Sequence, residues 1–256
     1  MQRRSSHHFK HFGRMLACRF ALVSSRGLAF LPCATPMSSV SYMGATPKES
    51  LIVFLPGLGD FAEDFEARGF INALVDSGLP ADAIAVDAHY GYYARRSVID
   101  RLAHDVVLPA HKRGYRDVWL VGISMGGMGA LSYAAHHAEH VRRVLLLGPY
   151  LGEAKVIRAI REARSSSASP TDAGTTAEHV RKLWHWIGRY DPAQALLPKL
   201  YLGYGTRDRF ALAGAMLAAH LPPQHVRAIP GGHDWRTWKR LWDAFLASWV
   251  RPNQYP

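Results

Sequence analysis

The sequence predicts an α/β domain in which a mostly parallel sheet is flanked by helices on both faces. From residue 51 onward, short apolar or β-branched runs bounded by Gly, Pro or Asp alternate with longer segments of helical spacing. The short runs are almost continuously apolar, which is typical of strands that are buried on both faces. A chain of 256 residues with 48% hydrophobic residues is also long enough for one large domain with a substantial hydrophobic core.

The alternation defines six strands and five helices. The predicted strands are residues 51–55, 83–87, 118–121, 144–147, 200–202 and 226–229. The predicted helices are residues 65–77, 98–110, 125–137, 211–220 and 235–249. A strand followed by a helix, repeated along the chain, indicates parallel pairing, because each helix carries the chain back to the start of the next strand.

Residues 151–195 interrupt this alternation. A helical stretch over 153–164 is followed by residues 165–176, which are rich in Ser, Thr, Ala and Gly, and by a second helix around 179–190. The middle segment has the composition of a flexible loop. We therefore expect a small helical cap, inserted between two strands of the sheet.

The formal net charge of +11 is concentrated at the N-terminus. Residues 1–48 hold seven Lys or Arg and no acidic residue, whereas the other 208 residues hold 24 basic and 20 acidic side chains. We expect a basic leader or disordered extension over 1–48 and the folded domain over 49–256. The leader loosely resembles an export signal, although Arg19 and Arg26 interrupt its apolar part. An extension without targeting function, or a start codon assigned too early, is the alternative, and it favours the cytoplasm.

Composition argues against several other classes of protein. Two cysteines are too few for a disulfide scaffold. The sequence contains no run of 18 apolar residues, so we do not expect stable insertion into a membrane. The body has no basic stripe interleaved with aromatic residues, so nucleic acid is not an expected partner. No His, Cys or Asp cluster has metal-ligand spacing and no glycine-rich phosphate loop is present, so no metal and no cofactor are expected. The sequence does not specify the oligomeric state.

A serine follows the third predicted strand in a sequence suited to a nucleophile. Residues 122–126, Gly-Ile-Ser-Met-Gly, match the pattern G-x-S-x-G, in which a sharp turn between strand and helix exposes the serine oxygen. The pattern alone is weak, but here a strand precedes it and an alanine-rich helix follows. Glycine is a poor helix former, so Gly126 and Gly127 at a helix start indicate close packing of the backbone. Ser124 is the candidate nucleophile.

An acid and a histidine follow later strands. Asp208 stands directly after strand 200–202, and His233 lies on a glycine-rich loop after strand 226–229. A serine needs an imidazole to accept its proton and an acid to orient that imidazole. Asp234 is a rival acid, but it adjoins His233 and stands where the N-cap of a helix belongs. Asp208 is therefore the preferred third member.

The loop after the first strand, residues 55–60 (Leu-Pro-Gly-Leu-Gly-Asp), is the candidate oxyanion loop. Acyl transfer requires two preorganised N–H donors for the oxygen that becomes negatively charged. We expect the backbone N–H groups of Leu58 and Met125 to supply them. A glycine turn without a catalytic part is the alternative interpretation of this loop.

These residues together resemble the α/β-hydrolase superfamily, over about residues 50–250. The segment PGLGDFAEDF is similar to the oxyanion loop of the carboxylesterase and acyl-protein thioesterase branch, in which His usually replaces Pro56. GISMGGMGAL and GGHDWRTWKRLWDAF resemble the esterase D and mycolyltransferase-like branch. The resemblance implies an α/β-hydrolase fold, a serine esterase that forms an acyl-enzyme, a small-molecule ester as substrate, and no cofactor. A thioesterase or acyltransferase on the same triad, and a catalytically silent binding protein, are the alternatives.

Four aromatic residues are candidate substrate contacts. Tyr90 and Tyr150 follow strands whose carboxyl ends should open on the catalytic face, while Trp184 and Trp186 lie in the predicted cap. An aromatic wall at these positions could hold the acyl or alcohol group of an ester. Simple packing is the alternative role for each of them.

Overall fold

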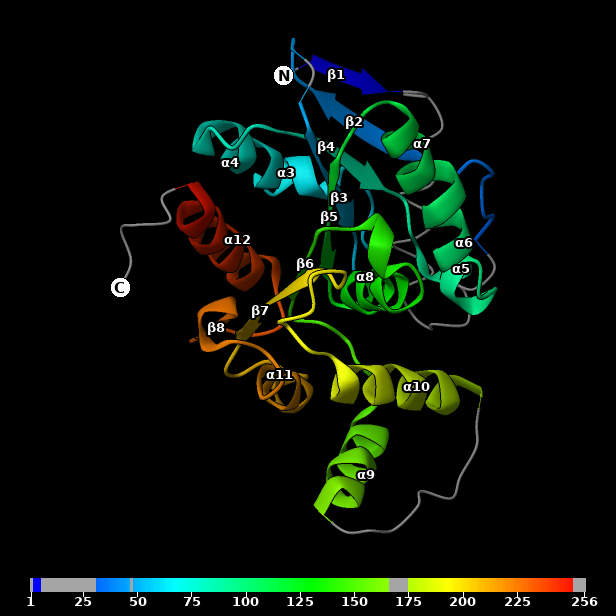
Figure 1. Cartoon of the computed structure of the whole chain (residues 1–256), viewed down its shortest axis with the longest axis vertical. Helices are drawn as coiled ribbons and strands as arrows, with labels where there is room; N and C mark the ends of the chain where they lie inside the picture. The colour runs from blue at the N-terminus through cyan, green and yellow to red at the C-terminus, as the bar shows by residue number, and fades with distance from the viewer. Residues whose placement is uncertain (1, 6–30, 47, 166–174, 251–256) are drawn as a thin grey trace.

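The computed structural model describes residues 2–5, 31–46, 48–165 and 175–250. In these residues eight strands form one sheet in the order β1-β2-β4-β3-β5-β6-β7-β8 (Figure 1). All pairs from β4 through β3 to β8 are parallel, whereas β1 and β2 add antiparallel pairs at one edge. The prediction of a mostly parallel sheet flanked by helices is thus confirmed.

All six predicted strands are present, and two further strands precede them. The strands are β1 Gln2–Ser5, β2 Ser39–Met43, β3 Ser50–Leu55, β4 Ala81–Val86, β5 Asp117–Ile123, β6 Arg143–Leu147, β7 Lys199–Gly205 and β8 Val226–Ile229. The central strands β3, β4 and β5 are buried over almost their whole length. This burial explains why their sequences lack the alternation of a half-exposed strand.

The helices follow the predicted order, except that two predicted helices are broken and a further short helix, α5, follows β4. They are α3 Asp64–Ala67, α4 Phe70–Ser77, α5 Tyr90–Ala94, α6 Val98–Leu102, the π-helix η1 Ala103–Val107, α7 Leu108–Lys112, α8 Met125–His136, α9 Ala154–Ser165, α10 Thr175–Arg189, α11 Ala211–Ala218 and α12 Trp235–Val250, with 3₁₀ turns η2 Ala138–His140 and η3 Pro223–His225.

Two predicted helices are broken in the structure. The helix predicted over 65–77 is divided into α3 and α4 by Gly69, which adopts a left-handed φ of 76°. The helix predicted over 98–110 contains the π-helical turn η1 immediately before Pro109. Proline has no N–H to donate to the carbonyl four residues earlier, so the regular helical ladder cannot continue through this position.

The domain begins earlier than predicted. Strand β2 lies within the predicted leader 1–48, yet it pairs with β4, and Met37, Val40 and Tyr42 are buried. The boundary at residue 49 is therefore wrong for this segment, because residues 39–43 form a strand of the sheet between β1 and β4. Most of the remaining leader, residues 6–30, lies outside the described residues.

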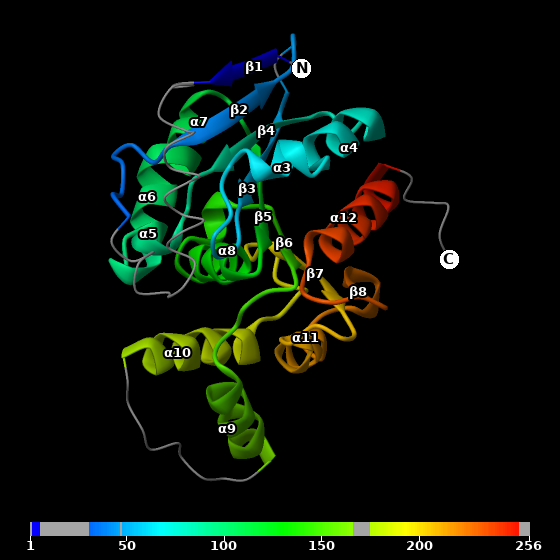
Figure 2. The same cartoon turned by 180° about the vertical axis from the view of Figure 1, so that it is seen from behind.

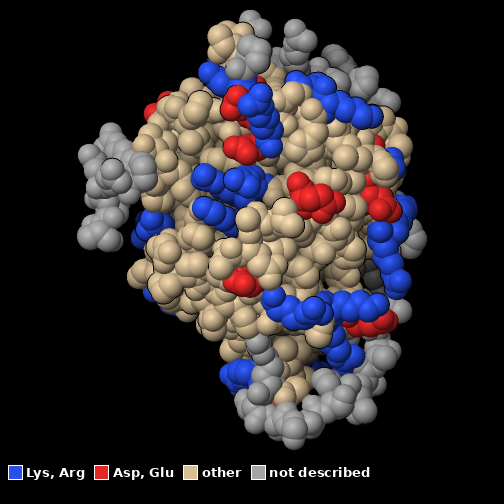
Figure 3. Space-filling view, viewed as in Figure 1, with Lys and Arg blue, Asp and Glu red and all other residues tan. Residues whose placement is uncertain are grey.

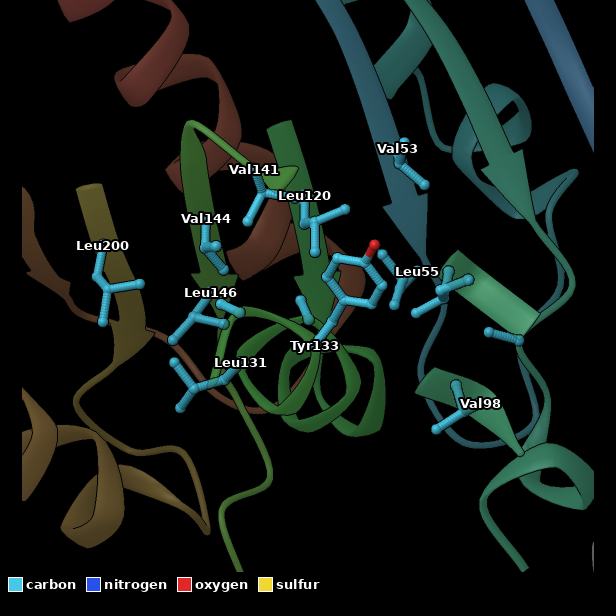
Figure 4. Packing of buried hydrophobic residues seen from close by; sticks show 14 of the residues in the cluster. Val53, Leu55, Val98, Leu120, Leu131, Tyr133, Val141, Val144, Leu146 and Leu200 are labelled. Carbon is cyan, nitrogen blue, oxygen red and sulfur yellow. The ribbon is translucent and has the colours of Figure 1, made fainter. Parts of the chain in front are cut away.

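Each face of the sheet has its own hydrophobic core. One core packs α8, α10 and the α6–α7 segment against the sheet, and Figure 4 shows Leu131 and Tyr133 of α8 facing strand residues such as Leu120 and Leu146. The other core joins α3, α4 and α12 to the opposite face, as the view in Figure 2 shows. At its centre the indole N–H of Trp242 donates to the carbonyl oxygen of Phe70 (3.0 Å), which ties α12 to α4.

The segment between β6 and β7 contains the two predicted helices. Buried Ile157 of α9 and buried Leu183 and Ile187 of α10 join the core on the α8 side. His179 of α10 bonds to Ser132 of α8, with 3.1 Å between Nε2 and Oγ. The predicted loop over 165–176 lies largely outside the described residues. The function of α9 and α10 as a cap over the site stays a prediction.

Basic and acidic side chains are interspersed on the face shown in Figure 3. This agrees with the near balance of charges counted for residues 49–256. Across the described residues, no helix is long and apolar enough to cross a membrane.

Candidate active site

The candidate nucleophile lies on a strained turn between β5 and α8. Ser124 has φ 51° and ψ −113°, a backbone conformation that residues other than glycine rarely adopt. The turn is held by the Ser124 N–H, which donates to the Leu147 carbonyl (3.0 Å), and by the Ser124 carbonyl, which accepts from Tyr150 N–H (2.9 Å). A strained turn that neighbouring strands hold in place is how a serine oxygen is presented above a sheet.

Two glycines make this turn possible. A Cβ atom at Gly122 would collide with the backbone of Gly126, and a Cβ atom at Gly126 would collide with the carbonyl of Leu55. Strand β5, helix α8 and the loop after β3 are therefore in backbone contact. This close approach explains the glycines that the sequence places at an otherwise unfavourable helix start.

His233 joins the serine to Asp208. Its Nε2 lies 2.9 Å from Ser124 Oγ, and its Nδ1 lies 2.8 Å from Asp208 Oδ2. A carboxylate only accepts hydrogen bonds, so Nδ1 carries the proton and Nε2 is free to accept from the serine hydroxyl. The side chain of Asp208 is 1% exposed and that of His233 is 11% exposed, so water competes little for these bonds.

Backbone bonds fix the two loops that carry Asp208 and His233. Thr206 N–H donates to the Ile229 carbonyl and Arg207 N–H donates to the Gly231 carbonyl, both at 2.9 Å. Asp208 Oδ1 also accepts from the N–H of Phe210 (2.8 Å), which orients the carboxylate. The carboxyl ends of β7 and β8 are thus tied together where the acid and the imidazole meet.

Asp234, the rival acid, serves a different purpose. Its Oδ1 accepts from Thr237 N–H (2.8 Å) at the start of α12, and this bond is the main cause that lowers the pKa of Asp234. The structure therefore places Asp208, and not Asp234, against the imidazole. Asp234 caps a helix, as its position after the glycines suggested.

The loop after β3 lies against the serine. A Cβ atom at Gly57 would stand 3.4 Å from Ser124 Cβ. Asp60 N–H donates to the Gly57 carbonyl (3.3 Å), so the turn itself does not use the N–H of Leu58. Met125 is the first residue of α8, a position whose N–H has no partner within the helix. Both predicted oxyanion donors therefore belong to backbone segments beside Ser124.

Two aromatic rings that sequence reasoning did not assign to the site hold the imidazole. Phe210 and Trp238 contact His233 with ring centroids 4.8 and 4.9 Å away, each at an interplanar angle of 88°. Phe210 could have been suspected because it stands two residues after Asp208. Trp238 recurs with other tryptophans along α12 at roughly helical spacing, so its position in the sequence does not distinguish it from Trp242 in the core.

Asp60, the last residue of the candidate oxyanion loop, is a further acidic neighbour of His233. Its Oδ1 accepts from the indole N–H of Trp235 (3.2 Å). Burial raises the pKa of Asp60 to about 6, while the hydrogen bond from Trp235 and the electrostatic interactions with Arg68 and His233 act in the opposite direction. A carboxyl group with a raised pKa therefore lies close to the His233 imidazole.

The four predicted substrate contacts have different surroundings. Tyr150 packs edge-on against Phe210 (5.3 Å between centroids), and it lies near enough to Tyr90 for the two hydroxyls to interact electrostatically. Trp186 is half-buried against Tyr190 (5.6 Å). Trp184 is 4% exposed, and its indole N–H already donates to the Leu151 carbonyl (3.0 Å). Trp184 thus packs in the core on the α8 side, and its contact with a substrate stays a prediction.

A surface cleft lies away from these residues, between α4 and α12. Its lining includes Asn72, Asp76, Lys239 and Asp243, and none of the triad residues. The cleft is open to solvent and lined partly by charged side chains. It lies on the face of the sheet opposite α8. It does not mark the position of the serine.

Comparisons with known proteins agree on the fold. A family model described as the alpha/beta hydrolase fold matches residues 99–200. Among solved structures, a ferulic acid esterase is 17% identical with a TM-score of 0.58, over 84% of this chain and 91% of its own. S-formylglutathione hydrolase from Staphylococcus aureus is 16% identical with a TM-score of 0.55, over 81% and 83%.

A third similar structure is Est1E from Butyrivibrio proteoclasticus, which is 15% identical with a TM-score of 0.57, over 84% of this chain and 92% of its own. No curated protein sequence matches the chain. At these identities the structures establish the architecture. This chain has the α/β-hydrolase fold.

Proposed function

We propose that this protein is a serine hydrolase that cleaves carboxylic esters through an acyl-enzyme on Ser124. The observation that carries the proposal is the continuous hydrogen-bonded series from Ser124 Oγ through the His233 imidazole to the Asp208 carboxylate. These three side chains come from three separate loops at the carboxyl ends of β5, β7 and β8. Packing alone does not require a serine, an imidazole and an acid in this order.

In the first half of the reaction, Ser124 Oγ attacks the ester carbonyl while its proton passes to His233 Nε2. The negative charge of Asp208 stabilises the imidazolium that forms and keeps Nδ1 as the donor. The N–H groups of Leu58 and Met125 donate to the tetrahedral oxyanion, and each such donor contributes on the order of 3 kcal/mol. The C–O bond then breaks, and His233 returns the proton to the departing alcohol.

In the second half, water attacks the acyl group on Ser124. His233 accepts a proton from the water as the C–O bond to the carboxylate product forms. The acyl–serine bond breaks, and the imidazolium returns its proton to Ser124 Oγ. The products are one alcohol and one carboxylic acid, which equal the ester plus one water.

Tyr150 and Tyr90 are the proposed contacts of the substrate, because the short chain of ring contacts from Tyr150 through Phe210 leads to His233. Trp186 is a proposed contact only if α10 covers the bound substrate. Two of the similar structures are esterases named for, or solved with, ferulic acid, so an aromatic acyl ester belongs among the substrates to test.

The direct assay uses p-nitrophenyl esters of increasing acyl length, methyl ferulate and an acyl thioester, with the wild type beside Ser124→Ala. We expect ester hydrolysis by the wild type and a loss of about 10⁴-fold or more in kcat for the variant. Preference for the thioester would favour the thioesterase alternative on the same triad. If wild type and variant are equally inactive on every substrate, the enzyme proposal fails and a silent binding protein remains.

A further inference from the structure

A second cluster of polar side chains lies at the far end of α8 from Ser124. It consists of His137, Glu139 and His140, in the turn that joins α8 to β6. One ligand atom of each residue lies within 4.8 Å of the others. Helix α8 has 12 residues and is therefore about 18 Å long, so this cluster is well separated from the triad.

The spacing of these residues in the sequence predicts no metal site, but the backbone brings their side chains together. His137 leaves the helix with φ −138° and ψ 54°, and η2 then turns Glu139 and His140 back toward it. The two imidazole rings are consequently parallel, with centroids 5.2 Å apart and an interplanar angle of 9°.

Neighbouring residues hold His140 in an orientation suited to metal binding. Tyr133, which is fully buried in α8, has its hydroxyl 3.3 Å from His140 Nδ1. His111 holds the main chain, with its Nε2 2.9 Å from the His140 carbonyl oxygen. When Nδ1–H donates to the Tyr133 oxygen, the other nitrogen, Nε2, keeps its lone pair for a cation.

The surroundings of the cluster favour neutral imidazoles beside a carboxylate. Burial, His140 and His136 lower the pKa of His137, against the opposing charges of Glu139 and Asp100. Glu139 Oε1 lies 3.4 Å from His140 Nε2, and its side chain is 64% exposed. A neutral imidazole and a carboxylate are the forms of these side chains that bind a metal ion.

We propose that His137, Glu139 and His140 bind a divalent transition-metal ion such as Zn²⁺. Two imidazole nitrogens and one carboxylate oxygen suit Zn²⁺, whereas Mg²⁺ requires an all-oxygen octahedral shell. The three protein ligands leave a fourth position for water. The bound ion joins the end of α8 to the start of β6, so it stabilises the fold without taking part in ester hydrolysis.

The test is calorimetric titration of the full-length protein, without an affinity tag, with Zn²⁺ at pH 7.5. His7, His8 and His11 lie outside the described residues and are replaced by Ala in the parent protein, so that they cannot bind the metal. We expect one Zn²⁺ per chain, no binding of Mg²⁺, and a thermal midpoint that rises with Zn²⁺ concentration. The matched control is His185→Ala on α10, an exposed histidine, which should bind as the parent does.

Three variants decide the assignment. His140→Ala and Glu139→Gln should each weaken Zn²⁺ binding at least tenfold and abolish or reduce the thermal shift. Tyr133→Phe keeps the buried ring, and loss of its hydroxyl should weaken binding by about 10- to 100-fold. Glu139 is exposed, so its variant tests the site even if a histidine variant folds poorly. Equal Zn²⁺ affinity in the parent, His140→Ala and Glu139→Gln would overturn the proposal, as would a parent that binds no Zn²⁺ at millimolar concentration.

Discussion

His233 is held on several sides by groups with separate physical effects. Asp208 bonds to Nδ1 and Ser124 bonds to Nε2. The ring planes of Phe210 and Trp238 are nearly perpendicular to the imidazole plane. Hydrogen bonds determine the tautomer, whereas the aromatic contacts restrict the tilt of the ring. An imidazole that is held in this way does not need to be reoriented in order to act as the proposed general base.

The role of Asp208 can be tested by changing its charge while keeping its shape. Asp208→Asn should lower kcat by about 10³- to 10⁴-fold, because an amide can stabilise the wrong tautomer and cannot stabilise the imidazolium. Steady-state kinetics on the best ester measures this loss. Asp234→Asn is the matched control, since Asp234 caps α12, and it should retain activity within a few-fold. A larger loss for Asp234→Asn than for Asp208→Asn would reverse the assignment.

Asp60 makes a prediction about pH and stability. Because burial raises its pKa to about 6 in the folded protein, the folded state holds the proton more tightly than the unfolded chain does. Its contribution to the free energy of unfolding is therefore fully present below about pH 4, and it is lost as the pH rises through 6. Asp60→Asn removes this dependence, since the amide does not ionise.

Urea unfolding of the wild type and Asp60→Asn at a series of pH values measures the effect. Between pH 4 and pH 7.5 the variant should gain about 1–3 kcal/mol in unfolding free energy relative to the wild type. The difference at pH 4, where Asp60 is protonated in the folded state and close to its own pKa in the unfolded chain, is the internal reference. A difference that does not change with pH would contradict the raised pKa.

At the scale of the elements, the site depends on how closely the carboxyl ends of neighbouring strands approach. Gly148, directly after β6, has φ +51°, and a Cβ atom there would stand 2.9 Å from Asp208 Oδ2 and 2.6 Å from Trp238 Nε1. Strand β6 supplies none of the triad residues. It nevertheless limits where the acid and one of the rings around His233 can lie.

Gly148→Ala should therefore reduce both stability and activity. The positive φ costs about 1–3 kcal/mol for a residue with a side chain, and the new methyl group displaces Asp208 or Trp238. Gly78→Ala is the control, because Gly78 also has a positive φ (73°) but has no atom within 4 Å of the added Cβ. Thermal unfolding should detect a loss in both variants, whereas kcat/KM should fall only in Gly148→Ala. Equal kcat/KM values in the two variants would show that contact with Asp208 is unimportant.

The same scale explains which elements could be predicted. Strands β3, β5 and β6 are buried on both faces, so their apolar runs were unmistakable. Strand β2, Ser-Val-Ser-Tyr-Met, is short, alternates in burial and follows a basic segment, so nothing in its sequence distinguished it from the leader. The π-turn before Pro109 was missed because helical periodicity cannot show one extra residue in a turn.

At the scale of the whole molecule, the net charge of +11 says little about the α/β domain. The charge is concentrated in residues 1–48, while the body carries 24 basic and 20 acidic side chains, interspersed on the visible face (Figure 3). The fold is stabilised instead by the two hydrophobic cores, one on each face of the sheet. The strand ends that carry Ser124, Asp208 and His233 lie between these cores.

The candidate site was predictable where chemistry and position coincided. Ser124, Asp208 and His233 each follow a strand and each has a residue type that acyl transfer needs, so their order in the chain identified them before any distance was known. Phe210 and Trp238 were not identifiable, because aromatic residues also fill cores. The cluster at His137 was missed for another reason, since its geometry depends on the backbone of one turn.

The central claim is that Ser124 is a nucleophile activated by His233. The most direct measurement is labelling with a fluorophosphonate probe, followed by mass spectrometry of the proteolytic peptides. We expect one adduct per chain on the peptide that contains Ser124, loss of labelling in Ser124→Ala, and much slower labelling in His233→Ala, because the serine hydroxyl then has no base. Labelling of another residue, or undiminished labelling of Ser124→Ala, would contradict the account.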